Sequence, residues 1–116
     1  MSTLVQLIDD VVANKFALEN EQVSIGRHGD NTIQIDDVSV SGHHAIIRQK
    51  ASDYLDGVVE VFVEDLGSTN GTFLNGEKLE GATRLTNNDV LRLAWNEFKF
   101  VDDTRSTLEG TAHILQ

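Results

Sequence analysis

Hydrophobic and polar residues alternate along several short stretches of the chain, and this alternation constrains the fold more than any other feature. It is found in residues 5–7, 33–35, 59–64, 91–93 and 97–100. Successive side chains of a β-strand point to opposite faces, so the pattern predicts strands that each bury one face. No segment carries a sustained helical period of apolar residues. We therefore expect an all-β domain.

Turn-forming residues separate these stretches. Asn70-Gly71 and Asn75-Gly76 are Asn-Gly pairs, which favour the positive backbone angles of tight turns. Asn14-Lys15 and Asp56-Gly57 are further turn signals. Many short strands with such punctuation are typical of a β-sandwich or barrel.

Size and charge limit the functions that need to be considered. The chain has 116 residues, which suits one domain, and its net charge of -10 disfavours nucleic acid and acidic membranes as partners. It has no cysteine, which excludes a disulfide framework, a thiolate metal site and a cysteine nucleophile. We find no signal peptide and no apolar run long enough to span a bilayer, and we expect a cytoplasmic location.

Three turn-rich segments, residues 25–31, 40–45 and 65–76, carry the side chains that suit a bound phosphate. Arg27 offers a planar fork of donors that matches a phosphate. Ser41 and Thr69 offer hydroxyl donors, and Asn70 offers a donor and an acceptor suited to a peptide backbone. Loops at one end of a sandwich commonly hold binding residues on a rigid scaffold.

The order and spacing of these residues resemble the signature of the forkhead-associated (FHA) family. The matching elements are Gly26-Arg27, Ser41 followed by His44, Ser68-Thr69-Asn70-Gly71-Thr72 and Leu74-Asn75-Gly76. Each element is common by chance, but together they are specific. The resemblance extends from about Val5 to Val101.

This resemblance implies an all-β fold, an FHA-type (SMAD/FHA-like) β-sandwich of about eleven strands. It also implies binding of phosphothreonine peptides, with Arg27 and Ser41 on the phosphate, Thr69 beside the phosphothreonine and Asn70 on the ligand backbone. Five further positions match residues that shape or brace the loops: Gly26, His44, Gly71, Asn75 and Gly76. We expect the FHA domain to cover residues 1–103 and a C-terminal tail to cover residues 104–116.

One position departs from the family pattern. The family usually carries a longer polar residue after the serine, and this chain has Gly42. One ligand contact is thereby lost, and His43 is a candidate to replace it. Gly42, His43 and Ser68 are therefore additional candidate contacts.

The remaining motifs do not favour a catalyst, a cofactor or a metal. Residues 67–72 lack the lysine of a nucleotide-binding P-loop, and Ser41 lacks the flanking glycines of a nucleophile elbow. His43 and His44 are neighbours on an extended chain and would point to opposite faces, so we expect no metal site from them. We expect no catalytic residues and no cofactor.

The expected partner is a phosphothreonine-containing protein or peptide, modified by an upstream Ser/Thr kinase and bound by a monomer. We expect neither nucleic acid nor membrane as a partner. Two alternatives remain open at this point. One is an FHA-like scaffold that binds its partner without phosphate, and the other is a small hydrolase.

Overall fold

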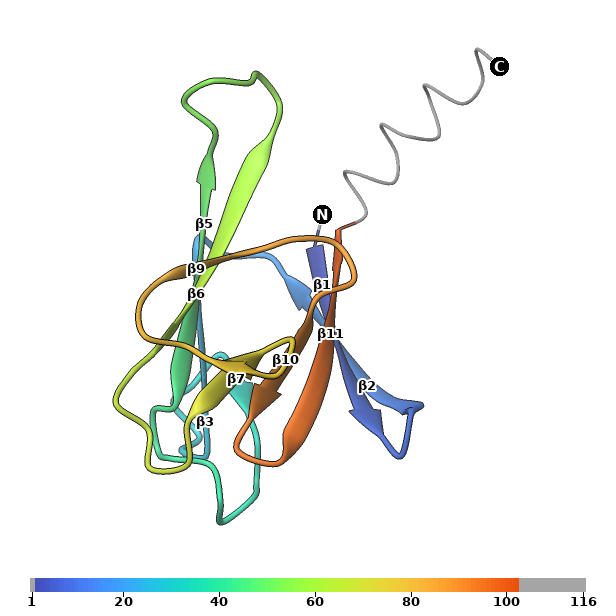
Figure 1. Cartoon of the computed structure of the whole chain (residues 1–116), viewed down its shortest axis with the longest axis vertical. Helices are drawn as coiled ribbons and strands as arrows, with labels where there is room; N and C mark the ends of the chain where they lie inside the picture. The colour runs from blue at the N-terminus through green and yellow to red at the C-terminus, as the bar shows by residue number, and fades with distance from the viewer. Residues whose placement is uncertain (1, 103–116) are drawn as a thin grey trace.

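The computed structural model describes residues 2–102, which form a sandwich of two β-sheets (Figure 1). Eleven strands are present in this part of the chain, and no helix occurs in it. The predicted all-β FHA-type sandwich is therefore confirmed. The predicted tail, residues 104–116, lies outside the described residues.

The first sheet has six strands in the order β2-β1-β11-β10-β7-β8. Their bounds are β1 Ser2–Ile8, β2 Val11–Leu18, β7 Thr72–Leu74, β8 Glu77–Lys78, β10 Val90–Leu93 and β11 Asn96–Asp102. All neighbouring strands in this sheet pair antiparallel.

The second sheet has five strands in the order β4-β3-β5-β6-β9. Their bounds are β3 Gln22–Gly26, β4 Ile33–Gln34, β5 Ala45–Ala51, β6 Val59–Asp65 and β9 Thr83–Leu85. Only the short β4 pairs in parallel, with β3. The central strands β3, β5 and β6 are antiparallel neighbours.

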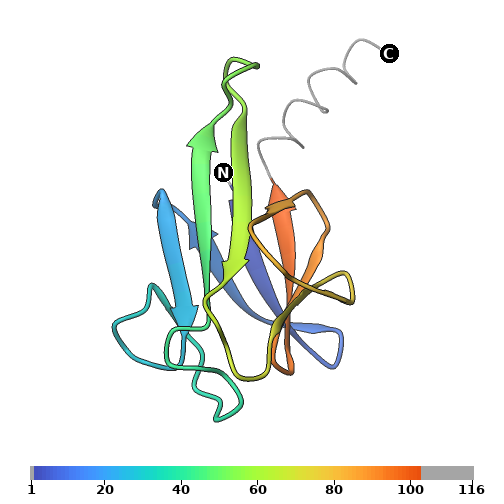
Figure 2. The ribbon, with the colours of Figure 1, turned by 60° about the vertical axis from the view of Figure 1, so that its left-hand side comes forward.

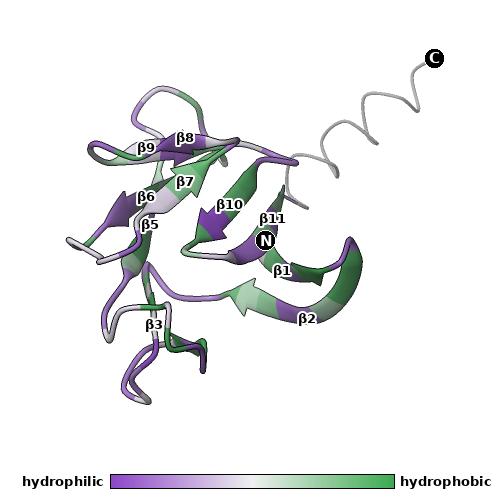
Figure 3. Cartoon of the chain, turned by 60° about the horizontal axis from the view of Figure 1, so that its bottom comes forward, coloured by the Kyte–Doolittle hydropathy of each residue, from purple (hydrophilic) through white to green (hydrophobic). Residues whose placement is uncertain are grey.

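The core lies between the two sheets and follows the predicted alternation. Val61 and Val63 on β6, Leu91 and Leu93 on β10 and Phe98 and Phe100 on β11 are all buried. Figure 3 shows hydrophobic and hydrophilic stretches on the same strands, for example on β2 and β10. Burial of this apolar surface is the main force that holds the sheets together.

The first hairpin differs from the sequence-based expectation in two ways. Asn14-Lys15 lies inside β2, and the turn falls at Asp9-Asp10, where φ is 53° and 65°. Aspartate tolerates this left-handed conformation better than most residues, and the pair matches a tight hairpin turn. The second difference concerns residues 5–7, whose alternation predicts that the polar Gln6 faces solvent. Gln6 is instead buried and accepts a hydrogen bond of 2.8 Å from Asn14, and Leu4 is the residue that β1 contributes to the core cluster.

Candidate functional site

Three loops gather at one end of the sandwich because of the strand order. They connect β3 to β4 (residues 27–32), β4 to β5 (residues 35–44) and β6 to β7 (residues 66–71). The register pairs Ile25 with Ala45 and Ala45 with Asp65, so the end of β3, the start of β5 and the end of β6 share one edge. Figure 2 shows the loops together at the lower end of the molecule.

Arg27 lies directly after β3 and is held by the second loop. Its backbone N–H donates to the Ser41 carbonyl at 3.0 Å, and its Nε–H donates to the Val40 carbonyl at 3.2 Å. Val40 is buried, whereas Arg27 is exposed. The two terminal nitrogens of the guanidinium make no hydrogen bond to the described residues. They therefore remain available as donors at the mouth of the loops.

Ser41 is positioned by the third loop. The Thr69 backbone N–H donates to Ser41 Oγ at 3.0 Å. This bond uses a lone pair of the hydroxyl and leaves its proton free to donate. Arg27 and Ser41 thus present donors from two loops that are joined to each other through the Arg27 backbone.

Asn70 ties the third loop to the second. Its Nδ2 donates to the Ser39 carbonyl at 2.7 Å, which orients the amide. Its carbonyl oxygen has no partner among the described residues and can accept a hydrogen bond. The predicted residues Arg27, Ser41, Thr69 and Asn70 are therefore brought together at one end of the sandwich.

His44 braces the second and third loops from inside. Its side chain is fully buried, with 0% exposure. Nδ1 accepts the Ser41 backbone N–H at 3.1 Å, so Nε2 carries the proton and donates to the Gly71 carbonyl at 2.9 Å. Because Nδ1 is engaged by the backbone N–H of Ser41, the geometry does not offer His44 as a base to the Ser41 hydroxyl.

Asp65 organises the third loop. It accepts hydrogen bonds from the hydroxyls of Ser68 and Thr72 and from the backbone N–H groups of Gly67 and Ser68. Burial alone would raise the pKa of Asp65, but these hydrogen bonds outweigh it and lower the pKa below its usual value. Ser68 Oγ also accepts from the Gly71 N–H at 3.0 Å. The Ser68 proton goes to Asp65 and is not available to a ligand.

Glycine at positions 26 and 42 allows two backbones to approach closely. A Cβ on Gly26 would lie 2.2 Å from the Gly42 carbonyl oxygen, a separation that real side chains do not adopt. Asn31, which is 8% exposed, donates from Nδ2 to the carbonyls of His28 and Gly42 at 2.8 Å and 2.7 Å. The first two loops are thereby clamped together.

The His43 side chain contacts two residues of the first loop, Asp30 and His28. Its Nε2 lies 3.1 Å from both carboxylate oxygens of Asp30. The hydrogen bond with His43 lowers the pKa of Asp30 from its usual value. The ring of His43 also meets the ring of His28 edge-on, with centroids 5.4 Å apart.

Asn75 and Gly76 stabilise a different turn. They form the β7–β8 hairpin turn with φ of 50° and 88°. The Asn75 side chain donates to Asp89 at 3.0 Å and accepts the Val90 N–H at 2.9 Å. These residues join the hairpin to the segment before β10, and they do not contact the phosphate-binding candidates.

Sequence analysis did not identify Asp65 or Asn31 as residues that hold the loops together. Asp65 lies two positions before Gly67 and three before Ser68, a spacing at which an aspartate side chain often accepts hydrogen bonds from the backbone of its own turn. Asn31 gave no comparable local signal, because its partners lie across a separate loop.

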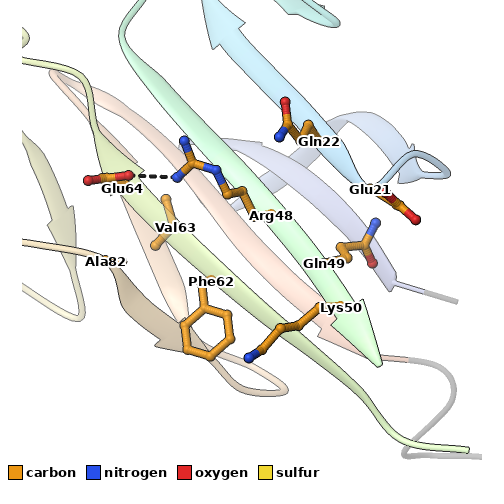
Figure 4. Close-up of a pocket in the computed structure, with 9 residues that line it drawn as sticks. All are labelled: Glu21, Gln22, Arg48, Gln49, Lys50, Phe62, Val63, Glu64 and Ala82. Atoms are coloured by element: carbon orange, nitrogen blue, oxygen red, sulfur yellow. Dashed lines mark hydrogen bonds and ion pairs between the residues drawn. The ribbon is translucent and has the colours of Figure 1, made fainter. Parts of the chain in front are cut away.

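A separate hollow of about 350 Å³ lies on the outer face of the second sheet (Figure 4). Phe62 on β6 is one of the residues that line it, and Lys50 Nζ lies over the Phe62 ring, 6.0 Å from its centroid. Arg48 pairs with Glu64 at 2.6 Å across the two strands. None of the phosphate-binding candidates lines this hollow, so it is distinct from the loop site.

Within residues 2–102, we find no helix with the length and apolar character needed to cross a membrane.

The chain belongs to the FHA domain family, whose model matches residues 23–94. Among curated proteins, it is 33% identical over 98 residues to the glycogen accumulation regulator GarA of Mycolicibacterium smegmatis, and the match covers 84% of this chain and 57% of GarA. The chain therefore spans little more than half the length of that relative.

Solved FHA structures share the fold. A structure from work on phosphothreonine-dependent FHA domain interactions superposes with a TM-score of 0.72 at 31% identity, covering 87% of this chain and 95% of the other. Mycobacterium tuberculosis EmbR in complex with a low-affinity phosphopeptide gives a TM-score of 0.72 at 29% identity, covering 86% of this chain and 24% of EmbR.

Proposed function

We propose that this chain is a phosphothreonine-dependent recognition domain and not an enzyme. It binds a phosphorylated segment of a partner protein through the loops after β3, before β5 and after β6. The observation that carries the proposal is the set of free hydrogen-bonding groups on three loops, of which the second is bonded to both the first and the third. These are the two terminal guanidinium nitrogens of Arg27, the hydroxyl proton of Ser41 and the side-chain carbonyl oxygen of Asn70.

Each group has a distinct role. Arg27 and Ser41 donate to the phosphate, because a dianion needs charged or strongly polar donors. Asn70 fixes the peptide backbone next to the phosphothreonine, and Thr69 lines the site beside it. The loops are fixed before the ligand arrives, which reduces the ordering cost of association.

The expected affinity is moderate. A hydrogen bond to a charged group contributes about 1.5–3 kcal/mol. Two or three such bonds, together with backbone contacts and less the cost of association, give about 8 kcal/mol, which corresponds to a dissociation constant on the order of micromolar. Such binding is reversible and follows the activity of an upstream Ser/Thr kinase.

We assign the domain to residues 1–103 and treat it as a monomer that acts in the cytoplasm. The absence of cysteine fits a reducing compartment. The net charge of -10 fits a protein partner better than nucleic acid or an acidic membrane.

A peptide library tests this function. Threonine peptides with varied residues after the central position are prepared in phosphothreonine, phosphoserine and unmodified forms, and binding is measured by calorimetry. Phosphothreonine peptides should bind, unmodified ones should not, and loss of one buried methyl should weaken phosphoserine binding by about 0.8 kcal/mol, or roughly fourfold. Equal binding of all forms would instead support a phosphate-independent scaffold, and release of inorganic phosphate would support a hydrolase.

A further inference from the structure

Two histidines and an aspartate from separate parts of the chain meet beside the phosphate-binding loops. One ligand atom from each of His28, Asp30 and His43 lies within 4.8 Å of the other two. His28 and Asp30 come from the loop after β3, and His43 comes from the loop before β5. All three residues are exposed, so an ion from solvent can reach them.

The backbone of both loops holds this cluster in place. The His28 N–H donates to the Gly42 carbonyl at 3.2 Å. Asn31 Nδ2 donates to the carbonyls of His28 and Gly42 and so fixes the separation of these two residues. A Cβ on Gly42 would lie 2.8 Å from His28 Nε2, so the absence of a side chain at position 42 leaves room for the imidazole. Thus Gly42, which departs from the family pattern, makes space for His28.

A simple ion pair does not account for the whole arrangement. His43 and Asp30 form such a pair at 3.1 Å, and exposed pairs of this kind contribute little to stability. The ring of His28 makes no hydrogen bond to the described residues, yet it lies against the ring of His43. The third group therefore adds a second nitrogen donor to a pair that is already formed.

The donor set suits a metal ion of intermediate softness. Two imidazole nitrogens and one carboxylate oxygen are ligands that Zn²⁺ accepts at about 2.0–2.2 Å, with water in a fourth position. Ligand atoms around such an ion are about 3.3 Å apart. His43 Nε2 and the Asp30 carboxylate are already 3.1 Å apart. The ligand nitrogen of His28 lies within 4.8 Å of both, and its exposed side chain has to move closer to them to bind the same ion.

We propose that His28, Asp30 and His43 form a binding site for a single divalent transition-metal ion, with Zn²⁺ as the ion tested. The proposal does not depend on phosphopeptide binding. It replaces the sequence-based expectation of no metal site, which considered His43 together with His44. The fold instead pairs His43 with His28, and His44 is buried in the brace between the loops.

Zinc titration of the full chain without a histidine tag tests the site. Calorimetry should show one ion per chain, and His28→Gln, Asp30→Asn and His43→Gln should each weaken binding at least about tenfold. Asp36→Asn, an exposed carboxylate, and His113→Gln, the one histidine besides the buried His44 that is not in the cluster, serve as matched controls and should bind as the parent chain does. Mg²⁺, which prefers oxygen ligands, should not compete.

Gly42→Ala provides a second, independent variant, because it retains all three ligands. The added methyl should displace the His28 ring and weaken zinc binding, while circular dichroism should show that the sandwich is retained. Absence of binding at about millimolar zinc, where the binding free energy is only about 4 kcal/mol, would overturn the proposal. Binding that survives all three ligand substitutions would overturn it equally.

Discussion

Replacement of His44 by alanine should destabilise the domain far more than any neighbouring substitution. His44 is fully buried and accepts the Ser41 N–H at 3.1 Å. Without it, that N–H loses its partner, at a cost of about 1–3 kcal/mol. The Gly71 carbonyl loses one bond but keeps the Ala94 N–H at 3.0 Å, so its loss is about 1 kcal/mol. The cavity left by the ring adds about 2 kcal/mol, which gives a total of about 4–6 kcal/mol.

Urea denaturation followed by circular dichroism measures this loss, provided that the dependence on urea is unchanged. His44→Asn is the intermediate variant, since its amide oxygen can occupy the position of Nδ1 and restore about 1–2 kcal/mol. His43→Ala, at an exposed position next in sequence, is the control and should change stability by about 0.5 kcal/mol or less. If His44→Ala lay within about 1 kcal/mol of the parent chain, the brace between the loops would be refuted.

Two further substitutions test the loops. Asp65→Asn should destabilise the domain by about 2 kcal/mol at neutral pH, because the carboxylate accepts bonds from Ser68 and Thr72 at a partly exposed position. Since the folded state lowers the pKa of Asp65, its contribution to stability is complete well above about pH 4 and is lost as the pH falls through the lowered pKa. The difference between the two chains in urea melts should therefore shrink as the pH falls below about 4. A difference that grows instead would be inconsistent with this role. Gly26→Ala should cost at least about 1–3 kcal/mol in thermal or urea unfolding, because its Cβ would overlap the Gly42 carbonyl, and an unchanged stability would show that the two loops are not in close contact.

Much of the fold follows from the sequence because strand alternation is a local property. Inward-facing residues of β6, β10 and β11 recur at every second position, and this pattern can be read directly from residues 59–64, 91–93 and 97–100. The same reasoning placed Arg27 and Ser41 in loops, and the order of β3, β5 and β6 in the sheet brings those loops to one edge.

The first hairpin shows where local signals fail. Asn14-Lys15 has turn-forming character, but both residues lie within β2 and pair with residues of β1. The turn falls instead at Asp9-Asp10, because the pairing of two strands decides the position of the turn and both aspartates tolerate positive φ. Residue preferences alone did not distinguish these two positions.

The sequence also did not predict the cluster of His28, Asp30 and His43. His43 is 13 positions from Asp30, and their contact depends on the backbone approach of Gly26 to Gly42. Such an approach is set by loop conformation and not by a periodic pattern. The sequence analysis instead considered the adjacent His43 and His44 together. In the structure, His43 contacts Asp30, whereas His44 is buried and braces the second and third loops.

Binding of a phosphothreonine peptide to the Arg27→Ala chain tests the recognition site most directly. Calorimetry should show at least about a tenfold loss of affinity, since a charged hydrogen bond is worth about 1.5–3 kcal/mol and a factor of ten corresponds to about 1.4 kcal/mol. Arg48→Ala removes an arginine from the outer face of the second sheet, where it pairs with Glu64, and should leave affinity unchanged. Equal affinities of the parent and Arg27→Ala chains, with both folded, would show that the phosphate is not bound by these loops.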